Sequence, residues 1–372
     1  MTGDTPSKEE FLRRQERVVA LMNSAGVDTL IVGHGPDLQY LTGIRSAESD
    51  RMTALVTRSS GATALITPSL DLDASIAQAE IAGITDLRGW SDDVGPLKEI
   101  QAVAGSPDCV MVNPNLSARP LLQLQAILQP KKIETAEAVT GVARMTKSPW
   151  EVEQLSHAAS AIMRVHSQVP NVLRVGASES QIATELTTLM LEAGHVTAEF
   201  VIVAVGANAA EPHHIPDETL ITAGELIVAD IGGPIGSGYF SDMTRMYCIG
   251  EPKQEPLAAF NLVKAAQERA CREIVCGMTT SQADAIARDL LVQHDLGKFF
   301  LHRLGHGIGL EVHEQPTLGG RDVVTIEDDM VFSVEPGVYV AGEFGARTED
   351  IVVMSGGRAE RLNTSSHELT IL

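Results

Sequence analysis

The sequence predicts two domains, an α/β domain over residues 1–140 followed by an α+β domain over residues 141–372. A chain of 372 residues is longer than one hydrophobic core usually supports, and a hydrophobic content of 44% suffices for two cores. Short β-like runs alternate with helical stretches over the first 130 residues or so, which is typical of an α/β domain. From about residue 150, helix pairs precede strand-rich stretches, which indicates helices beside a largely antiparallel sheet.

The first domain is expected to begin with a helix from Ser7 to Gly26. Ser7 and Glu10 match an N-terminal capping box, and apolar residues recur at helical spacing from Phe11 onward. Further helices are expected near residues 71–82 and 117–128. Strands are expected at residues 29–32, 54–57, 62–66 and 110–112, with a hairpin turn at 58–61.

In the second domain, Pro149 stands where a helix can begin, because proline is tolerated in the first turn. Helices are expected at residues 151–169, 179–193, 256–275 and 281–293. Strands are expected at residues 200–205, 226–230 and 239–248, and glycine-rich strand segments should follow to the C-terminus.

Composition excludes several classes of partner. A formal net charge of −21 argues against binding to nucleic acid or to an anionic membrane. No apolar run approaches the length of about 18 residues that a membrane span requires. The polar start of the sequence lacks the apolar core of a signal peptide, so a cytoplasmic location is expected. Four cysteines without C-x-x-C spacing predict buried, reduced thiols.

Five residues that can bind metal ions occur where charge is out of place. Asp230 ends an apolar strand, and Asp242 lies in the following strand, so that a hairpin would bring the two carboxylates side by side. His306 lies in a glycine-rich stretch, Glu335 ends an apolar run, and Glu349 directly precedes another. Any one of them alone is more simply a turn or surface residue, and the set carries the hypothesis.

Four carboxylates and one imidazole form an oxygen-rich set of ligands. Burying them together is prohibitive unless cations offset the charge. The set is typical of sites for Mn²⁺, Co²⁺, Fe²⁺ or Zn²⁺ and unlike a structural zinc site with thiolate ligands. Several carboxylates also permit bridging between two ions.

These residues resemble the methionine aminopeptidase/Xaa-Pro peptidase superfamily, whose catalytic domain has the pita-bread fold. The ligands of that family occur in the order Asp, Asp, His, Glu, Glu, which Asp230, Asp242, His306, Glu335 and Glu349 match. His213, in Glu-Pro-His, and His313, in Glu-Val-His-Glu, match its two histidines. The N-terminal domain, with Gln39-Tyr40-Leu41-Thr42-Gly43, resembles that of Xaa-Pro dipeptidases, aminopeptidase P and creatinase, whereas methionine aminopeptidases lack this domain.

The resemblance implies two divalent metal ions, with Mn²⁺ expected first and Co²⁺, Zn²⁺ or Fe²⁺ as alternatives. Asp242 would bind one ion and His306 the other, while Asp230 and Glu349 would bridge them. Glu335 would bind metal and also shuttle the proton of the attacking water, as base and then as acid.

Three further residues are implied to act around the metal ions. His213 and His313 would hydrogen-bond the substrate, although the neighbouring His214 is an alternative to His213. Arg347, two residues before a ligand, would orient Asp230 or gate the site. The resemblance also implies a homodimer and a short proline-containing peptide as substrate.

Two departures from the family pattern bear on function. Asp230 and Asp242 are 12 positions apart, one more than is common, and the extra residue is expected in the turn 234–238. Dipeptidases often carry a basic residue at the position of Thr317, for which Arg321 is a substitute. The sequence thus predicts an Xaa-Pro dipeptidase, with an aminopeptidase P-like enzyme as the alternative.

The same fold also hosts proteins that do not cleave peptides. These are amidinohydrolases without the metal ligands, a lyase and a hydrolase that act on small polar metabolites, and binding modules that have lost the metal set. The intact set of five ligands argues against the first and the last.

Overall fold

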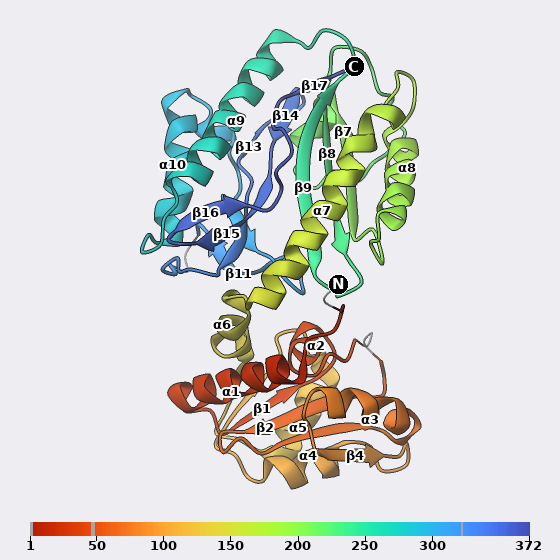
Figure 1. Ribbon diagram of the computed structural model, residues 1–372, viewed down its shortest axis with the longest axis vertical. Coiled ribbons are helices and arrows are strands. Elements are labelled where there is room, and N and C mark those ends of the chain that lie inside the picture. Colours follow the sequence, from red (N-terminus) through yellow and green to blue (C-terminus); the bar gives the residue numbers. More distant parts are fainter. Residues whose placement is uncertain (1–2, 46–48, 321–322) are drawn as a thin grey trace. The chain divides into compact units, whose positions relative to one another are not determined.

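The computed structural model describes residues 3–45, 49–320 and 323–372. The chain forms two compact units, Met1–Arg144 and Met145–Leu372 (Figure 1). Each has its own sheet system and core, and each is described by itself.

The N-terminal unit contains a six-stranded mixed sheet in the order β4-β3-β2-β1-β5-β6. Strands β1, β2 and β3 pair antiparallel, whereas β4, β5 and β6 join the sheet through parallel pairings. The strands are β1 (Thr29–Val32), β2 (Ala54–Arg58), β3 (Thr63–Pro68), β4 (Asp86–Trp90), β5 (Cys109–Val112) and β6 (Lys132–Thr135).

Helices connect these strands. They are α1 (Lys8–Ala25), α2 (Pro36–Thr42), α3 (Leu72–Ile81), α4 (Leu97–Ala104), α5 (Ala118–Leu128) and α6 (Thr140–Met145), with short 3₁₀ turns η1 (Ser69–Asp71) and η2 (Ala136–Ala138). Ser7 caps α1 by accepting a hydrogen bond from the backbone N–H of Glu10 at 3.2 Å, but the Glu10 carboxylate pairs with Arg14. The predicted cap therefore forms on one side only.

The second unit begins with two long helices, α7 (Pro149–Val172) and α8 (Glu179–Glu192), followed by the antiparallel strands β7 (Phe200–Val205), β8 (Leu226–Pro234) and β9 (Phe240–Cys248). The helices α9 (Gln254–Glu273) and α10 (Thr280–Gln293) come next. The remaining elements are η3 (Gly206–Ala210), η4 (Gly297–Phe299), β10 (Gly305–Gly307), β11 (Glu314–Leu318), β12 (Val331–Val334), β13 (Gly337–Val340), β14 (Phe344–Arg347), β15 (Asp350–Ser355), β16 (Arg358–Arg361) and β17 (Thr370–Ile371).

Local sequence sets where these helices begin. Ser148, Ser178 and Thr279 each cap a helix, and each forms a reciprocal capping box with the residue three positions later. Pro149 occupies the first turn of α7, where its missing N–H costs nothing. The chain therefore enters each helix at a defined residue.

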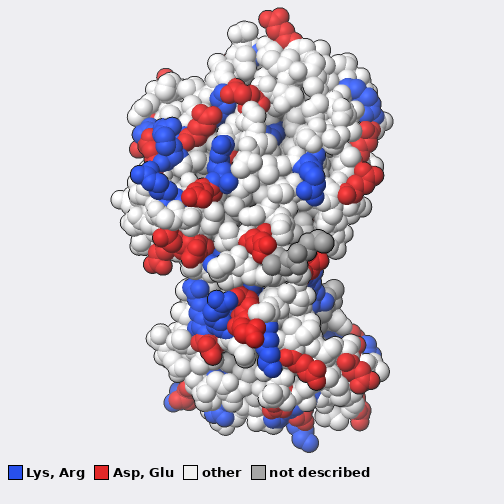
Figure 2. Space-filling view, in the orientation of Figure 1, with Lys and Arg blue, Asp and Glu red and all other residues white. Residues whose placement is uncertain are grey.

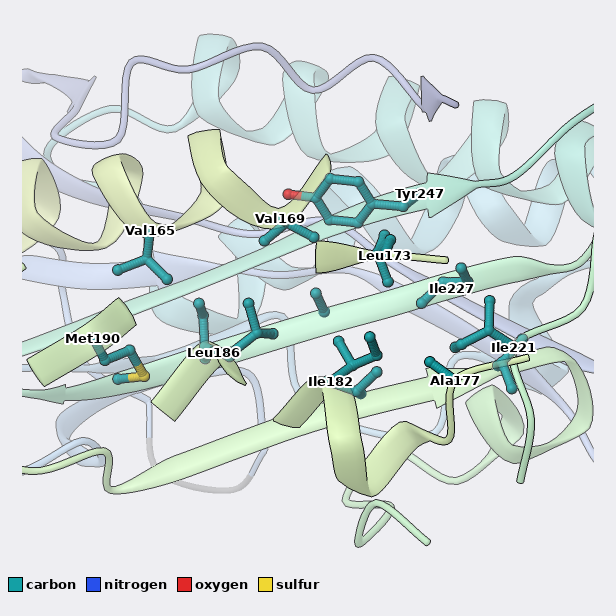
Figure 3. Packing of buried hydrophobic residues seen from close by; sticks show 14 of the residues in the cluster. Val165, Val169, Leu173, Ala177, Ile182, Leu186, Met190, Ile221, Ile227 and Tyr247 are labelled. Carbon is teal, nitrogen blue, oxygen red and sulfur yellow. The ribbon is translucent and has the colours of Figure 1, made fainter. Parts of the chain in front are cut away.

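The core of this unit lies between the helices α7 and α8 and the sheet (Figure 3). Val165 and Val169 of α7 meet Ile182 and Leu186 of α8 over Ile227 of β8, and all five are at most 1% exposed. This packing fixes the first turn of α8 relative to strands β7 and β8.

The hairpin of β8 and β9 keeps one register over its whole length, with Asp230 opposite Thr244 and Gly232 opposite Asp242. The two carboxylates therefore share one face of the hairpin as diagonal neighbours. The residues that join the strands are 235–239, and a hydrogen bond from Ile235 N–H to Tyr239 C=O closes them at 3.0 Å. This confirms that the longer spacing is absorbed in the turn.

The predicted fold class is confirmed, with differences in detail. Helices α2, α4 and α6 and strands β4 and β6 were not predicted, because they are short. All four cysteines are free thiols, as expected, but only Cys248 is buried and the others are half-buried. Acidic and basic side chains interleave on the face shown in Figure 2. No helix among the described residues is long and apolar enough to cross a membrane.

Replacing Leu186 by alanine should destabilise the second unit by about 2–5 kcal/mol, because its fully buried side chain would leave a cavity between α8 and the sheet. Leu191→Ala on the same helix is the matched control, since Leu191 is 51% exposed and should change stability by less than about 0.5 kcal/mol. Urea denaturation followed by circular dichroism measures both. Equal effects of the two substitutions would contradict this account of the core.

Candidate metal centre

The structure brings the five predicted ligands together. The Nε2 atom of His306 lies 3.1 Å from Oε1 of Glu335 and 3.6 Å from Oδ2 of Asp242. Ligand atoms of Asp242, His306 and Glu349 all lie within 4.8 Å of one another. Asp230 is held on the same face of the hairpin as Asp242. Side-chain exposure is 15% for Glu335 and 10% or less for the aspartates and His306.

Different strands deliver these side chains. Asp230 and Asp242 come from β8 and β9, His306 comes from β10, Glu335 directly follows β12, and Glu349 directly precedes β15. Strand β10 runs between β11 and β12, where space is limited. A Cβ atom on Gly305 would lie 1.9 Å from the Ser333 carbonyl oxygen, so only glycine lets the strands approach this closely.

Burial makes the negative charges of the site unfavourable. Desolvation, together with neighbouring carboxylates, raises the pKa of Asp242 and that of Glu349 well above their usual range. Desolvation also raises the pKa of Asp230, although the charge of Arg347 opposes the rise. Divalent cations bound among these three carboxyl groups would neutralise their charges and favour the ionised form.

Two carboxylate oxygens are available as ligands. Oδ1 of Asp230 and Oε1 of Glu349 are buried, and neither has a hydrogen-bond partner among the described residues. Leaving such oxygens unpaired is costly, and a metal ion is a suitable partner for both. The residues present therefore fit a centre for divalent metal ions.

Arg347 connects the carboxylates to the surrounding frame. Its Nη2 lies 2.5 Å from Oδ2 of Asp230, its Nη1 donates to the Tyr339 hydroxyl at 2.6 Å, and its Nε donates to the Thr244 hydroxyl at 3.3 Å. Desolvation opposes the charge of Arg347, but Tyr339, Asp230 and Glu335 raise its pKa well above the usual range. The arginine therefore stays charged and orients Asp230, as predicted for one of its two alternative roles.

Hydrogen bonds also orient His306 and Glu335. Nδ1 of His306 lies 3.1 Å from the Gly307 carbonyl, and this contact holds the ring with Nε2 toward the Glu335 and Asp242 carboxylates. The Ser333 hydroxyl donates to Glu335 at 3.0 Å. Burial works against ionisation of Glu335, but the hydrogen bond and charge of His306 lower its pKa to about 2.

The two predicted substrate-binding histidines, His213 and His313, are both exposed, and His313 lies beside a ligand. The ring of His313 packs edge-on against that of His306, with the centroids 4.2 Å apart. Desolvation and the positive charges of His306 and Arg303 lower the pKa of His313 to about 4, and the charge of His213 contributes to the shift. The residue before His213, Pro212, accepts a hydrogen bond from Arg347 at 3.2 Å, which places the His213 segment next to that arginine.

A buried ion pair fixes the segment that carries His313. Nζ of Lys147 lies 2.6 Å from Oε1 of Glu314, with side-chain exposures of 1% and 6%. His214, the alternative to His213, is buried and hydrogen-bonded to Glu179. It is therefore a less suitable substrate ligand than His213.

Sequence reasoning missed Thr244, Ser333 and Tyr339. Thr244 donates to Oε2 of Glu349 at 2.8 Å and lies two residues after Asp242, on the same face of β9. The alternation of side chains along a strand could have identified it. Ser333 lies two positions before Glu335, and Tyr339 bonds Arg347 within the hairpin of β13 and β14, but neither residue type by itself marks a metal site.

Two positions bear on how a substrate carboxylate is held: that of Thr317, where a basic residue is common in dipeptidases, and that of Arg321, its expected substitute. Thr317 lies on β11 opposite His306 and is half-buried. Arg321 lies outside the described residues.

Comparison with known proteins identifies this arrangement. The model of metallopeptidase family M24 matches residues 153–355, a span that contains all five ligands, and the creatinase/prolidase N-terminal domain matches residues 14–146. The chain belongs to metallopeptidase family M24. It is therefore a peptidase with the pita-bread fold, of a family that uses divalent metal ions, as the sequence predicted.

Several relatives align with the chain over nearly its whole length. A protein of Mycobacterium tuberculosis named probable dipeptidase PepE is 38% identical, over 98% of this chain and 97% of that protein. The crystal structure of dipeptidase PepE from Mycobacterium ulcerans has a TM-score of 0.93 at 36% identity and covers 99% of both chains. An Xaa-Pro dipeptidase of Pyrococcus furiosus is 26% identical over 96% of this chain and 99% of that protein.

Adding Mn²⁺ to metal-free protein should release protons, because Asp242 and Glu349 have raised pKa values and must lose their protons to bind a cation. The release should be larger at pH 6 than at pH 8, and metal affinity should rise with pH. Titration calorimetry in two buffers of different ionisation enthalpy measures it.

The matched pair of variants is Asp242→Asn and Glu343→Gln, since Glu343 is an exposed carboxylate in the turn between β13 and β14. Asp242→Asn should reduce proton release and weaken binding, whereas Glu343→Gln should behave as the unaltered protein. Binding without proton release at pH 6 would contradict the assignment of these carboxylates.

Proposed function

We propose that the protein hydrolyses the Xaa-Pro bond of dipeptides, with two divalent metal ions of which Mn²⁺ is the first expectation. The observation that carries this proposal is the buried set of Asp230, Asp242, His306, Glu335 and Glu349, with exposed histidines beside it. The name Xaa-Pro dipeptidase, borne by a relative that aligns over 96% of this chain, supports the choice of substrate.

The ligand set suggests separate catalytic roles for the metal ions and for Glu335. Bound divalent ions would lower the pKa of a water molecule and polarise the scissile carbonyl group. Glu335 is the most exposed of the carboxylates, at 15%, whereas Glu349 is 1% exposed. Glu335 is therefore the carboxylate that a substrate and a water molecule can reach. We assign it the transfer of the proton from the water to the departing nitrogen.

His213 and His313 are proposed to bind the substrate. Both side chains are exposed, the His313 ring packs against that of His306, and Pro212, the neighbour of His213, is hydrogen-bonded to Arg347. An imidazole there can donate a hydrogen bond to the oxygen on which negative charge develops as the carbonyl is attacked. Arg347 stays behind the carboxylates and acts through Asp230.

Preference for proline fits a site that supplies no acceptor at the scissile nitrogen. The nitrogen of an Xaa-Pro bond is a tertiary amide without N–H, so it needs no hydrogen-bond partner. Any other residue at that position would leave an N–H unsatisfied on burial.

The runner-up is an aminopeptidase P-like activity on longer peptides. Thr317 stands where a basic residue would hold the carboxylate of a dipeptide, and this observation favours the runner-up. Action on a small polar metabolite is the third candidate. The homodimer and the cytoplasmic location expected from the sequence stay predictions.

Hydrolysis of three matched peptides distinguishes these functions. We expect the Mn²⁺-loaded protein to cleave an Xaa-Pro dipeptide in preference to an Xaa-Pro-Xaa tripeptide and to leave an Xaa-Ala dipeptide intact. A preference for the tripeptide would move the assignment to an aminopeptidase. Cleavage of none of the three, with metal confirmed bound, would contradict action on Xaa-Pro bonds.

Glu335→Ala is the matched inactive variant, and it should lose about 10²-fold or more in kcat because proton transfer is lost. Glu343→Gln serves as the control with an exposed carboxylate and should retain full activity. Substantial residual turnover by Glu335→Ala would show that another group transfers the proton.

A further inference from the structure

The loop that carries His213 is anchored by a fully buried carboxylate. Glu179, the first residue of α8, is 0% exposed. Its Oε1 accepts a hydrogen bond from Val205 N–H at 2.7 Å, and Oε2 lies 2.7 Å from Nε2 of His214. The side-chain amide of Asn208 and the backbone N–H of Asp217 also donate to it, at 3.1–3.3 Å.

These donors flank His213 in sequence. Val205 and Asn208 precede it, whereas His214 and Asp217 follow it, so one carboxylate ties the segment on both sides. A buried carboxylate is costly unless its oxygens are satisfied, and here donors surround it. The segment therefore has a strong energetic reason to keep this one conformation.

A second anchor holds the segment from the metal centre. Nη2 of Arg347 donates to the carbonyl of Pro212 at 3.2 Å, and the same nitrogen contacts Asp230. Close packing adds to this anchor, because a Cβ atom on Gly345 of β14 would lie 1.7 Å from the Ala209 carbonyl oxygen. Pro212 and His214, on either side of His213, are therefore fixed by two different partners.

The cluster of Glu179, His214 and Asp217 has the residue types of a metal site, but its geometry indicates otherwise. N–H groups from four residues point at the Glu179 carboxylate, and such donors repel a cation. The Asp217 carboxylate is exposed and accepts from Thr219 N–H at 2.7 Å. The cluster is thus a hydrogen-bonded anchor.

We propose that Glu179 and His214 are positioning residues, which hold the His213 ring where it meets the substrate across from His313. The proposal rests on the proposed function, because it gives His213 a role in binding substrate. Neither Glu179 nor His214 touches the substrate, and both act through the backbone on each side of His213. Because core packing fixes α8, the Glu179 carboxylate at its first residue is a fixed acceptor for the segment that carries His213.

The test compares His214→Phe with His214→Gln. Phenylalanine keeps the ring and removes the donor, whereas glutamine keeps an N–H near the position of Nε2. The reference variant is His213→Ala, and the control is His157→Phe, since His157 is exposed on α7. Each protein is Mn²⁺-loaded, and its metal content, melting temperature and kcat/KM on an Xaa-Pro dipeptide are measured.

We expect His214→Phe to lower kcat/KM by roughly 10- to 100-fold with metal content unchanged, because the histidine is displaced. His214→Gln should recover activity to within about threefold of the unaltered protein. In the His213→Ala background, His214→Phe should lower kcat/KM by no more than about a further twofold, because both substitutions remove the same contribution of His213.

Hydrogen–deuterium exchange gives a readout that does not depend on activity. Amides within residues 206–217 should exchange faster in His214→Phe than in His214→Gln or His157→Phe. Unchanged exchange there would overturn the inference, as would fully additive losses in the double variant or full activity of His213→Ala. If the unaltered protein cleaves no peptide, the proposed function fails, and the exchange measurement alone decides whether the anchor holds the segment.

Discussion

The concentration of buried carboxylates around His306 is the constraint on which the rest of the structure depends. Asp242 and Glu349 resist ionisation in the absence of a cation, because each is desolvated and surrounded by like charge. Assembling these carboxylates lowers the free energy of unfolding of the metal-free protein, and binding of divalent ions would raise it again. Arg347 is the fixed positive charge that keeps Asp230 in place meanwhile.

The architecture of the second unit serves that constraint. The regular register of β8 and β9 places two carboxylates on one face, and the absence of side chains at Gly305 lets β10 deliver His306 between two neighbours. The helices bury the opposite side of the sheet and hold it rigid (Figures 1 and 3). The catalytic groups therefore stand on strands, whereas the proposed substrate ligands stand on loops that need their own anchors.

Much of the fold and most of the site follow from local patterns in the sequence. Of the capped amphipathic helices, α8 was predicted to within one residue at each end and α7 to within three, since their signals are contained in a few neighbouring positions. Charged residues in apolar strands marked Asp230 and Glu335 as unusual. The short elements α2 and β6 were missed, because contacts with the rest of the unit stabilise them more than local propensity does.

The supporting residues were harder to predict than the ligands. Ser333 and Tyr339 are ordinary strand residues whose hydrogen bonds to Glu335 and Arg347 no motif marks, and Glu179 has the sequence signature of an ordinary helix start. Sequence also left His213 and His214 as alternatives, and the buried contact of His214 with Glu179 distinguishes their environments. Long-range pairing of this kind is not encoded in any local period.

The most direct test of the central claim is a crystal structure of the Mn²⁺-loaded protein with anomalous diffraction measured at the manganese edge. The account predicts two anomalous peaks among Asp230, Asp242, His306, Glu335 and Glu349. Oδ1 of Asp230 and Oε1 of Glu349, which accept no hydrogen bond from the described residues, should lie within bonding distance of metal. A single peak, or peaks located away from these five side chains, would contradict the assignment of a two-metal centre.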